Sequence, residues 1–338
     1  ELKELNCSYC TVLTSILVLP ELKILYCNYC TSLTNIPVLP ELEQLFCLYC
    51  TALTSIPVLP ELEYLNCRKC TALTSIPILP NLEQLYCSRC TALTSISELV
   101  ELKLLYCNNC TSLKNIQIFP KLKELFCENC KQLTSIPVLS ELKSLYCAGV
   151  NSTSIPILPK LITLNCTDCT ALTSIPVLSE LKTLDCVGCT ALTSIPVMEE
   201  LVDLFCAGCT RLTKIPVLSK LKHLDCSSCT RLASVPTIHL TMMNCMNCTS
   251  LTSIPEIKTT LFLLDGCKWL NDLQDFEENM RALRICQAMW KRKVLGRKLE
   301  RVIPIVSEIY YSPGCKGEHL AERAFLTKAR VKKLIGTQ

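Results

Sequence analysis

Hydrophobic residues recur along most of the chain with a period of twenty residues. Each unit reads LxxLxCxxCTxLTSIPxLPx, in which leucine, cysteine and isoleucine hold the apolar positions and polar residues lie between them. In the first unit Leu5 and Cys7 alternate with Glu4 and Asn6, which is the period-two pattern of a strand buried on one face. Each unit therefore predicts one short strand followed by a compact return.

Thirteen consecutive units follow this pattern, and a degraded fourteenth comes after them. Their lengths are 19–21 residues, because the eighth and twelfth units are one residue short and the thirteenth is one residue long. A period near twenty is too short for a pair of helices, so the sequence predicts a solenoid over residues 1–268. The units begin at Leu2, Leu22, Leu42, Leu62, Leu82, Leu102, Leu122, Leu142, Leu161, Leu181, Leu201, Leu221, Leu240 and Leu261.

Prolines occupy the return segment of most units. A proline inside a helix removes a hydrogen bond and clashes with the preceding turn, so these returns cannot be helical. Polyproline-like, extended geometry is favoured instead. The prolines that follow the isoleucine or valine of the motif are Pro37, Pro57, Pro77, Pro137, Pro156, Pro176, Pro196, Pro216, Pro236 and Pro255.

The motif LxxLxCxxCTxL resembles the leucine-rich repeat, L-x-x-L-x-L-x-x-N/C-x-L, over about 265 residues. Its IPxLP ending is similar to the shortest repeats of this superfamily, which occur in secreted bacterial effector proteins. The cysteine-rich repeat with a basic tail also resembles repeat proteins of giant, mimivirus-like DNA viruses. The resemblance implies a leucine-rich-repeat solenoid with a parallel β-sheet on its concave face and extended convex returns. It also implies that the second cysteine replaces an asparagine that bonds neighbouring backbone groups.

The cysteines form pairs spaced C-x2-C-x16-C-x2-C, within the range of zinc ribbons. A structural zinc site needs four dedicated ligands, whereas this series of cysteines is unbroken and singles out no four of them. Val150 stands at one second-cysteine position, which suits an apolar environment. We therefore expect reduced cysteines that stack in the core, with zinc and disulfides as the alternatives, and we predict no metal or cofactor.

Composition and charge limit the class of protein and the compartment in which it can be expected. Hydrophobic residues make up 49% and charged residues 19% of the 338 residues, so the chain is not expected to be disordered. The net charge of +4 does not predict nucleic-acid or membrane binding. No apolar run approaches the roughly 18 residues of a membrane span. Without a secretory leader, 28 cysteines indicate a reducing compartment, so we predict a cytoplasmic protein, in the host cytoplasm if it is viral.

The fifth position of the unit faces out of the predicted concave sheet and is aromatic in seven of thirteen units. Six of these aromatics lie in units two to eight, and basic residues flank them at the eighth position. The aromatics either pair along a strand ladder or form a binding stripe for a partner of acidic character. The predicted partner-binding residues are Tyr26, Phe46, Tyr86, Tyr106, Phe126, Tyr146, Lys69 and Arg89.

The repeat stops near residue 269, and residues 269–338 predict a basic, helical C-terminal cap. Residues 270–338 hold 14 basic and 8 acidic side chains, a net charge of +6. Three interpretations of these basic residues remain open: a solvated helix face, a patch for an acidic partner or nucleic acid, and a calmodulin-type target helix. Nucleic acid is disfavoured. Glu1 leads directly into a full repeat, so we expect either a missing native extension or self-association through this end.

Three classes of function compete. Histidine-based catalysis has only His223, His239 and His319 to draw on, and a tail of about 70 residues is too short for a ubiquitin-ligase domain. We therefore predict a non-catalytic module that binds a protein partner on its concave face, in keeping with a viral or effector protein that acts on host proteins. The alternatives are a structural component, for example of a virion, and the adaptor part of a ubiquitin-ligase system.

Overall fold

The computed structural model describes residues 2–236, 240–252, 261–263 and 266–267. The chain divides into two units, Glu1–Thr260 with Leu264–Asp272 and Leu261–Leu263 with Leu273–Gln338. The predicted helical cap at 269–338 lies outside the described residues. All the strands except β16 (Leu261–Leu263) belong to the first unit.

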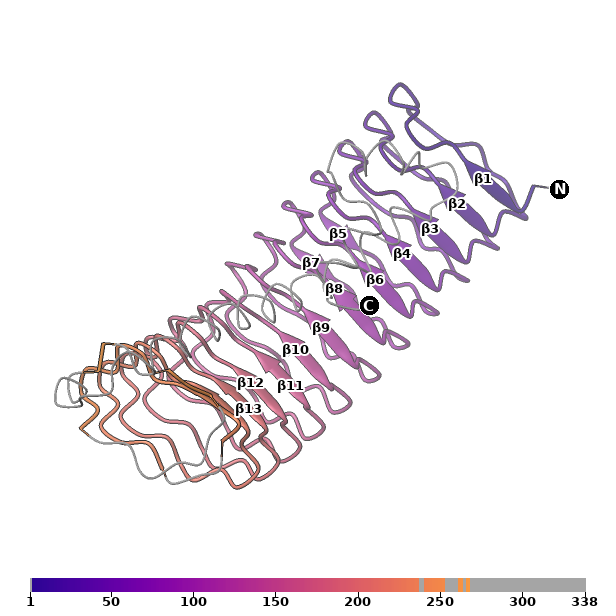
Figure 1. Ribbon diagram of the computed structural model, residues 1–338. Coiled ribbons are helices and arrows are strands. Elements are labelled where there is room, and N and C mark those ends of the chain that lie inside the picture. The colour runs from indigo at the N-terminus through magenta and orange to yellow at the C-terminus, as the bar shows by residue number, and fades with distance from the viewer. Residues whose placement is uncertain (1, 237–239, 253–260, 264–265, 268–338) are drawn as a thin grey trace, which may run out of the picture. The chain divides into compact units, whose positions relative to one another are not determined.

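Each coil of the solenoid contributes one three-residue strand to a sheet (Figure 1). Two further strands, β5 (Ser75–Ile76) and β7 (Ser95–Ile96), pair with each other in the returns, and β16 spans Leu261–Leu263. The sheet strands of the first unit are β1 (Glu4–Asn6), β2 (Ile24–Tyr26), β3 (Gln44–Phe46), β4 (Tyr64–Asn66), β6 (Gln84–Tyr86), β8 (Leu104–Tyr106), β9 (Glu124–Phe126), β10 (Ser144–Tyr146), β11 (Thr163–Asn165), β12 (Thr183–Asp185), β13 (Asp203–Phe205), β14 (His223–Asp225) and β15 (Met242–Asn244).

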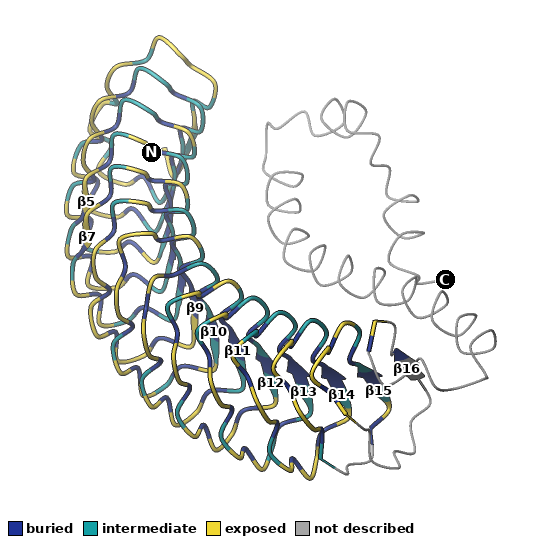
Figure 2. Ribbon diagram, turned by 90° about the vertical axis from the view of Figure 1, so that its left-hand side faces the viewer, coloured by how far each residue is buried: buried dark blue, intermediate teal, exposed yellow. Residues whose placement is uncertain are grey.

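Neighbouring strands pair in parallel, in chain order, and in the register of the sequence repeat. Leu85 of β6, for example, lies opposite Leu105 of β8. Within this unit the coils curve, with the strands on the inner side and β5 and β7 on the outer side (Figure 2). The predicted parallel sheet on a concave face is confirmed.

The returns are extended, as the prolines predict. The described returns contain no helix, and their regular structure is limited to the β5–β7 pair and two isolated parallel bridges. These bridges join Ser154 to Ser174 and Lys214 to Ser234. Because a proline carries no N–H, it leaves few donors for a longer outer sheet.

The core is a stack of equivalent apolar side chains from successive coils. In the coil that begins at Leu82, all seven inward residues are at most 1% exposed: Leu82, Leu85, Cys87, Cys90, Leu93, Ile96 and Leu99. Every described cysteine is a free thiol, and all of them are buried except Cys7 and Cys10 in the first coil. The expectation that the cysteines stack in the core is confirmed for the described residues from Cys27 onward, and their reduced state stays a prediction.

The two cysteines of each coil hold successive coils together. We call them the first and second cysteine columns. The second-column thiol donates a hydrogen bond to the carbonyl oxygen of the first-column cysteine one coil earlier, at 3.0–3.2 Å. This bond recurs from Cys30 to Cys267, and at Val150 a buried side chain without a donor interrupts it. The thiol therefore takes the role that the resemblance gives to asparagine.

The turn between the two cysteines uses a left-handed residue in every described coil. Its φ is 61° at Tyr29, 60° at Lys69 and 68° at Gly149. The backbone N–H of this residue donates to the next coil, for example from Tyr29 to the carbonyl oxygen of Leu48 at 2.7 Å. A side chain in this conformation costs about 1–2 kcal/mol, which explains why glycine, asparagine and aspartate enter this position in later coils.

We expect Cys107→Ser to lower the free energy of unfolding by about 1–3 kcal/mol, because a hydroxyl replaces a fully buried thiol of the first column. Cys110→Ser should lower it less, since its hydroxyl can donate to the carbonyl oxygen of Cys87 as the thiol does. Urea unfolding of both variants, followed by circular dichroism, measures the difference. An equal or larger loss for Cys110→Ser would contradict the hydrogen-bonding role of the second column.

Candidate functional site

Seven aromatic rings stack in one row along the concave sheet, from β2 to β10. Successive ring centroids are 4.0–5.3 Å apart. The closest pair, Tyr106 and Phe126, is nearly parallel, at 4.0 Å and 5°. The parallel register places equivalent side chains of neighbouring coils side by side, so the rings meet face to face. This aromatic row consists of Tyr26, Phe46, Tyr64, Tyr86, Tyr106, Phe126 and Tyr146.

Tyr64 is a member of the row that the sequence analysis missed. In β4 the fifth position of the unit is Asn66, which is buried, and Tyr64 lies two residues earlier on the same face of the strand. Its ring bridges Phe46 at 4.9 Å and Tyr86 at 5.3 Å, tilted by 34° and 39°. The period of two along a strand could have revealed this substitution from the sequence.

The rings of the row are not freely exposed, so that part of the prediction is wrong. Tyr26, Phe46, Tyr86, Tyr106 and Tyr146 are half-buried, and Phe126 is only 8% exposed. Each inner ring is covered on both faces by its neighbours, and the hydroxyl of Tyr86 donates a hydrogen bond to Oε1 of Gln84 at 3.2 Å. The stacked rings therefore support the fold, as the strand-ladder interpretation predicts, and the binding stripe stays a prediction.

Basic side chains lie against the aromatic rings. The guanidinium carbon of Arg68 lies 4.5 Å from the ring centroid of Tyr86 and 5.6 Å from that of Tyr106. Lys69 places its Nζ 5.2 Å from the ring of Tyr49. Arg89, also predicted as part of a positive rim, is exposed. The contacts of Arg68 and Lys69 with the rings are cation–π interactions. The predicted set lacked Arg68 because its side chain reaches the rings of the next two coils.

A second, shorter stack follows the left-handed turn position at the N-terminal end. Tyr9 and Tyr29 stack at 4.9 Å, and Tyr29 and Tyr49 at 5.2 Å. Lys69 occupies the next place in this column. The first coils therefore offer two parallel lines of aromatic and basic side chains.

Polar side chains replace the aromatics in β11, β12, β14 and β15, whereas β13 keeps an aromatic residue, Phe205, which is 7% exposed. Asp185 accepts hydrogen bonds from Asn165 and Thr167, and Asp203 is paired with His223. Asp225 is only 2% exposed and accepts from the backbone and hydroxyl of Ser227, at 3.0 and 2.7 Å. Burial raises the pKa of the Asp225 carboxyl, although these hydrogen bonds oppose the shift.

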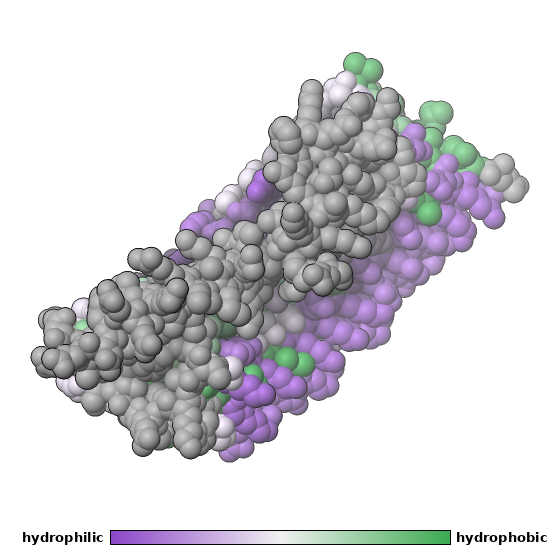
Figure 3. Space-filling view, viewed as in Figure 1, coloured by the Kyte–Doolittle hydropathy of each residue, from purple (hydrophilic) through white to green (hydrophobic). Residues whose placement is uncertain are grey.

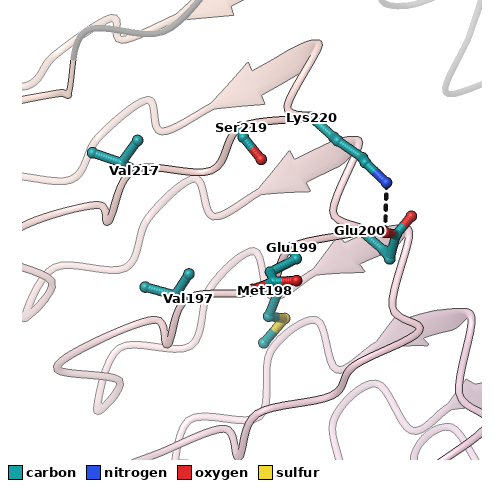
Figure 4. Close-up of a pocket in the computed structure, with 7 residues that line it drawn as sticks. All are labelled: Val197, Met198, Glu199, Glu200, Val217, Ser219 and Lys220. Atoms are coloured by element: carbon teal, nitrogen blue, oxygen red, sulfur yellow. Dashed lines mark hydrogen bonds and ion pairs between the residues drawn. The ribbon is translucent and has the colours of Figure 1, made fainter.

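The visible described surface is mostly hydrophilic in Figure 3, with hydrophobic residues gathered near the N-terminal end. Val12, Leu17 and Val18 are exposed in that first coil. Tyrosine counts as weakly hydrophilic on this scale, so a row of tyrosine edges does not stand out by hydropathy alone. Its distinguishing features are the ring stacking and the adjacent cations.

The two cysteine columns differ in the pKa of their thiols. Burial raises the pKa of the Cys127 thiol in the first column well above its ordinary value, whereas hydrogen bonding with Cys107 lowers the pKa of the Cys130 thiol in the second column. Both side chains are fully buried, which restricts the access of reagents to them. In the described part of the chain, no three or more histidine, cysteine, aspartate or glutamate side chains are grouped so that they could hold a metal ion. The described residues also include no helix long and apolar enough to span a membrane.

Comparisons with known proteins agree with this architecture. Residues 60–101 match the family model "Leucine Rich repeats (2 copies)". A leucine-rich repeat protein from Bacteroides ovatus, known from a crystal structure, matches with a TM-score of 0.51 and 20% sequence identity, over 77% of this chain and 78% of that one. No curated protein matches the sequence. The chain has the leucine-rich-repeat fold, and the predicted resemblance to this superfamily is confirmed.

We expect Phe126→Ser to lower the free energy of unfolding by about 3 kcal/mol, because the ring is buried and stacked on both faces. Phe126→Tyr should change it little, since tyrosine fills the same place in the neighbouring coils. Thermal and urea unfolding measure both changes. A Phe126→Ser variant as stable as the unmodified chain would show that the row contributes nothing to the fold.

We expect Asp225→Asn to stabilise the chain at neutral pH. Because the folded pKa of Asp225 is raised, stability falls as the pH rises from about 4, the unfolded value, through the folded pKa. Asparagine is accepted at the equivalent buried positions Asn66 and Asn165 and removes this dependence. Unfolding at pH 3 and pH 7 should show an advantage for the variant at pH 7 that is lost at pH 3. An advantage of equal size at both pH values would exclude this origin.

Proposed function

We propose that this leucine-rich-repeat solenoid is a non-catalytic interaction module that binds a protein partner across the aromatic row. The observation that carries the proposal is the stack of seven rings with Arg68 laid over two of them. Rings fixed in this way lose little conformational entropy on binding, which is what interface anchors require. Solenoids commonly use their concave faces as extended binding surfaces.

The geometry of the row favours a partner that lies across the ring edges. Centroid distances of 4.0–5.3 Å leave no room for a side chain between two rings. Ring edges are positively polarised, and Arg68, Lys69 and Arg89 add cationic charge beside them. We infer a partner surface rich in carboxylates and backbone carbonyls, and therefore of acidic character.

We place this interaction in a reducing compartment, such as the cytoplasm. The support is that the described cysteines are free thiols whose columns hydrogen-bond as thiols, from Cys30 onward. Disulfides would remove the donors on which the coil-to-coil bonds depend. An oxidising compartment would favour such disulfides.

Removing rings would destabilise the fold, so the test of binding adds negative charge beside the row instead. Gln84→Glu and Ser144→Glu, combined, place two carboxylates at half-buried strand positions next to the rings, where they repel an acidic partner, and the new carboxylate at position 84 keeps an acceptor for the hydroxyl of Tyr86. The matched control is Met242→Glu, at the equivalent strand position of β15 beyond the row. A partner captured from cell extract is purified, and its binding to all three chains is measured by calorimetry.

The proposal expects the Gln84→Glu and Ser144→Glu chain to bind the purified partner at least tenfold more weakly, and the Met242→Glu chain to bind as the unmodified chain does. Raising the salt concentration should also weaken binding, because exposed charges are screened. Unchanged binding by the double variant, with its fold verified by circular dichroism, would place the partner elsewhere on the chain.

A further inference from the structure

The turn between the two cysteines carries large side chains in a backbone conformation that disfavours them. In the first five coils the left-handed residue of this turn has a φ of 60–65°. A side chain is unfavourable in this region because its Cβ crowds the following carbonyl oxygen. Strained residues of this kind concentrate at functional sites, which makes this turn a candidate for a function. The residues are Tyr9, Tyr29, Tyr49, Lys69 and Arg89.

The later coils show that the solenoid does not need a large residue at this position. From the sixth coil onward the described turns hold only asparagine, glycine, aspartate or serine there. Crowding does not select the glycine at Gly208, since an added Cβ would meet only backbone atoms of Gly188, at 3.7 and 3.8 Å. Glycine adopts a positive φ without a steric cost, and asparagine and aspartate tolerate it well. The later coils therefore relieve a strain that the first five coils keep.

Side-chain contacts offset this strain only in part. Tyr29 stacks between Tyr9 and Tyr49, at centroid distances of 4.9 and 5.2 Å. The Nζ of Lys69 lies 5.2 Å from the ring centroid of Tyr49. Arg89 is exposed, and it forms neither an ion pair nor a cation–π contact with any other residue that the structure describes. Contacts within the described part of the chain therefore do not explain why an arginine occupies the left-handed turn.

The turn is cationic where it adjoins the aromatic row. In the first five coils the two residues between the cysteines include three basic residues and no acidic one. Arg68 lies over Tyr86 of the row, and Lys69 is the next residue along the chain. The backbone N–H of Lys69 donates to the carbonyl oxygen of Ser88 at 2.9 Å, which places Lys69 beside Arg89 in the next coil. Two cations in adjacent coils can pair with two carboxylates of one partner segment.

We propose that Lys69 and Arg89 select the protein partner by binding a carboxylate-rich segment of it, with Tyr49 beside them as a hydroxyl donor. The proposal rests on the function proposed above and names the part of the partner that this end of the site recognises. A carboxylate accepts hydrogen bonds from both ammonium and guanidinium groups, and these charge-assisted bonds are stronger than neutral ones. The first five coils keep strained, large residues because these contact the partner, and the later coils lack this contact.

Urea unfolding measures the strain in the absence of any partner. Arg89→Asn supplies the residue type that the next coil carries at Asn109, and we expect it to raise the urea midpoint of unfolding. The reciprocal variant, Asn109→Arg, should lower the midpoint, because it introduces the strain in a coil that lacks it. A midpoint that Arg89→Asn leaves unchanged or lowers would show that the arginine does not cost stability, and would overturn the proposal.

Fluorescence anisotropy with a labelled peptide of about ten glutamates measures the binding of carboxylates. Lys69→Asn combined with Arg89→Asn should weaken the binding of this peptide at least fivefold. The matched control, Lys182→Asn combined with Lys222→Asn, removes the same charge from exposed positions next to β12 and β14 and should bind the peptide as the unmodified chain does. Equal binding by the two double variants, or no binding by the unmodified chain, would overturn the proposal. Binding of inorganic polyphosphate in place of the peptide would do so as well.

The purified partner separates this proposal from the one on which it rests. We expect its binding to be weakened both by Gln84→Glu with Ser144→Glu and by Lys69→Asn with Arg89→Asn. Binding that only the first pair weakens would remove the turn from the site and leave the proposed function standing. Binding that neither pair weakens would contradict the proposed function, and this proposal with it.

Discussion

The hydrogen bond from a thiol of one coil to the cysteine carbonyl of the preceding coil, together with the backbone bonds between coils, sets how the solenoid is stacked. The bond from Cys90 to the carbonyl oxygen of Cys67 measures 3.0 Å and lies in a fully buried interior. The same carbonyl oxygen accepts the backbone N–H of Cys70 at 3.2 Å, so the thiol is its second donor. Backbone bonds from coil to coil keep the strand register at Val150, where the thiol is missing. These contacts hold each coil at a fixed offset from the last.

Because the offset between coils is fixed, the side chains at each outward position of the repeat form a line along the solenoid. The fifth position becomes the aromatic row, the turn position becomes the shorter tyrosine stack, and the position after the proline becomes a line of exposed valine and isoleucine residues. Stacking then changes the character of each line, because the neighbours cover part of every residue. Phe126 is buried by Tyr106 and Tyr146 although its strand position points outward. The binding surface that we propose is for this reason also a stabilising element.

The repeat could be predicted in detail from the sequence because its signal recurs thirteen times. The strands, the inward cysteines and the extended returns all follow from the period and the prolines. Tyr64 and Arg68 could not be found by aligning equivalent positions, since Tyr64 fills a gap from a different strand position and Arg68 reaches rings two coils away. The sequence also did not predict that the rings of the row are half-buried. The alternation of residues along one strand does not show how far the rings of the neighbouring strands cover them. The helical cap at 269–338 and the viral resemblance remain predictions.

Raman spectroscopy of the S–H stretching band tests the thiol-to-carbonyl account most directly. In the folded chain we expect the band of hydrogen-bonded thiols, shifted to lower frequency than that of free thiols, and no S–S stretching band. Unfolding in denaturant under reducing conditions should return the S–H band to the position of free thiols. An S–S band in the folded chain, or an S–H band that unfolding leaves unchanged, would contradict the account.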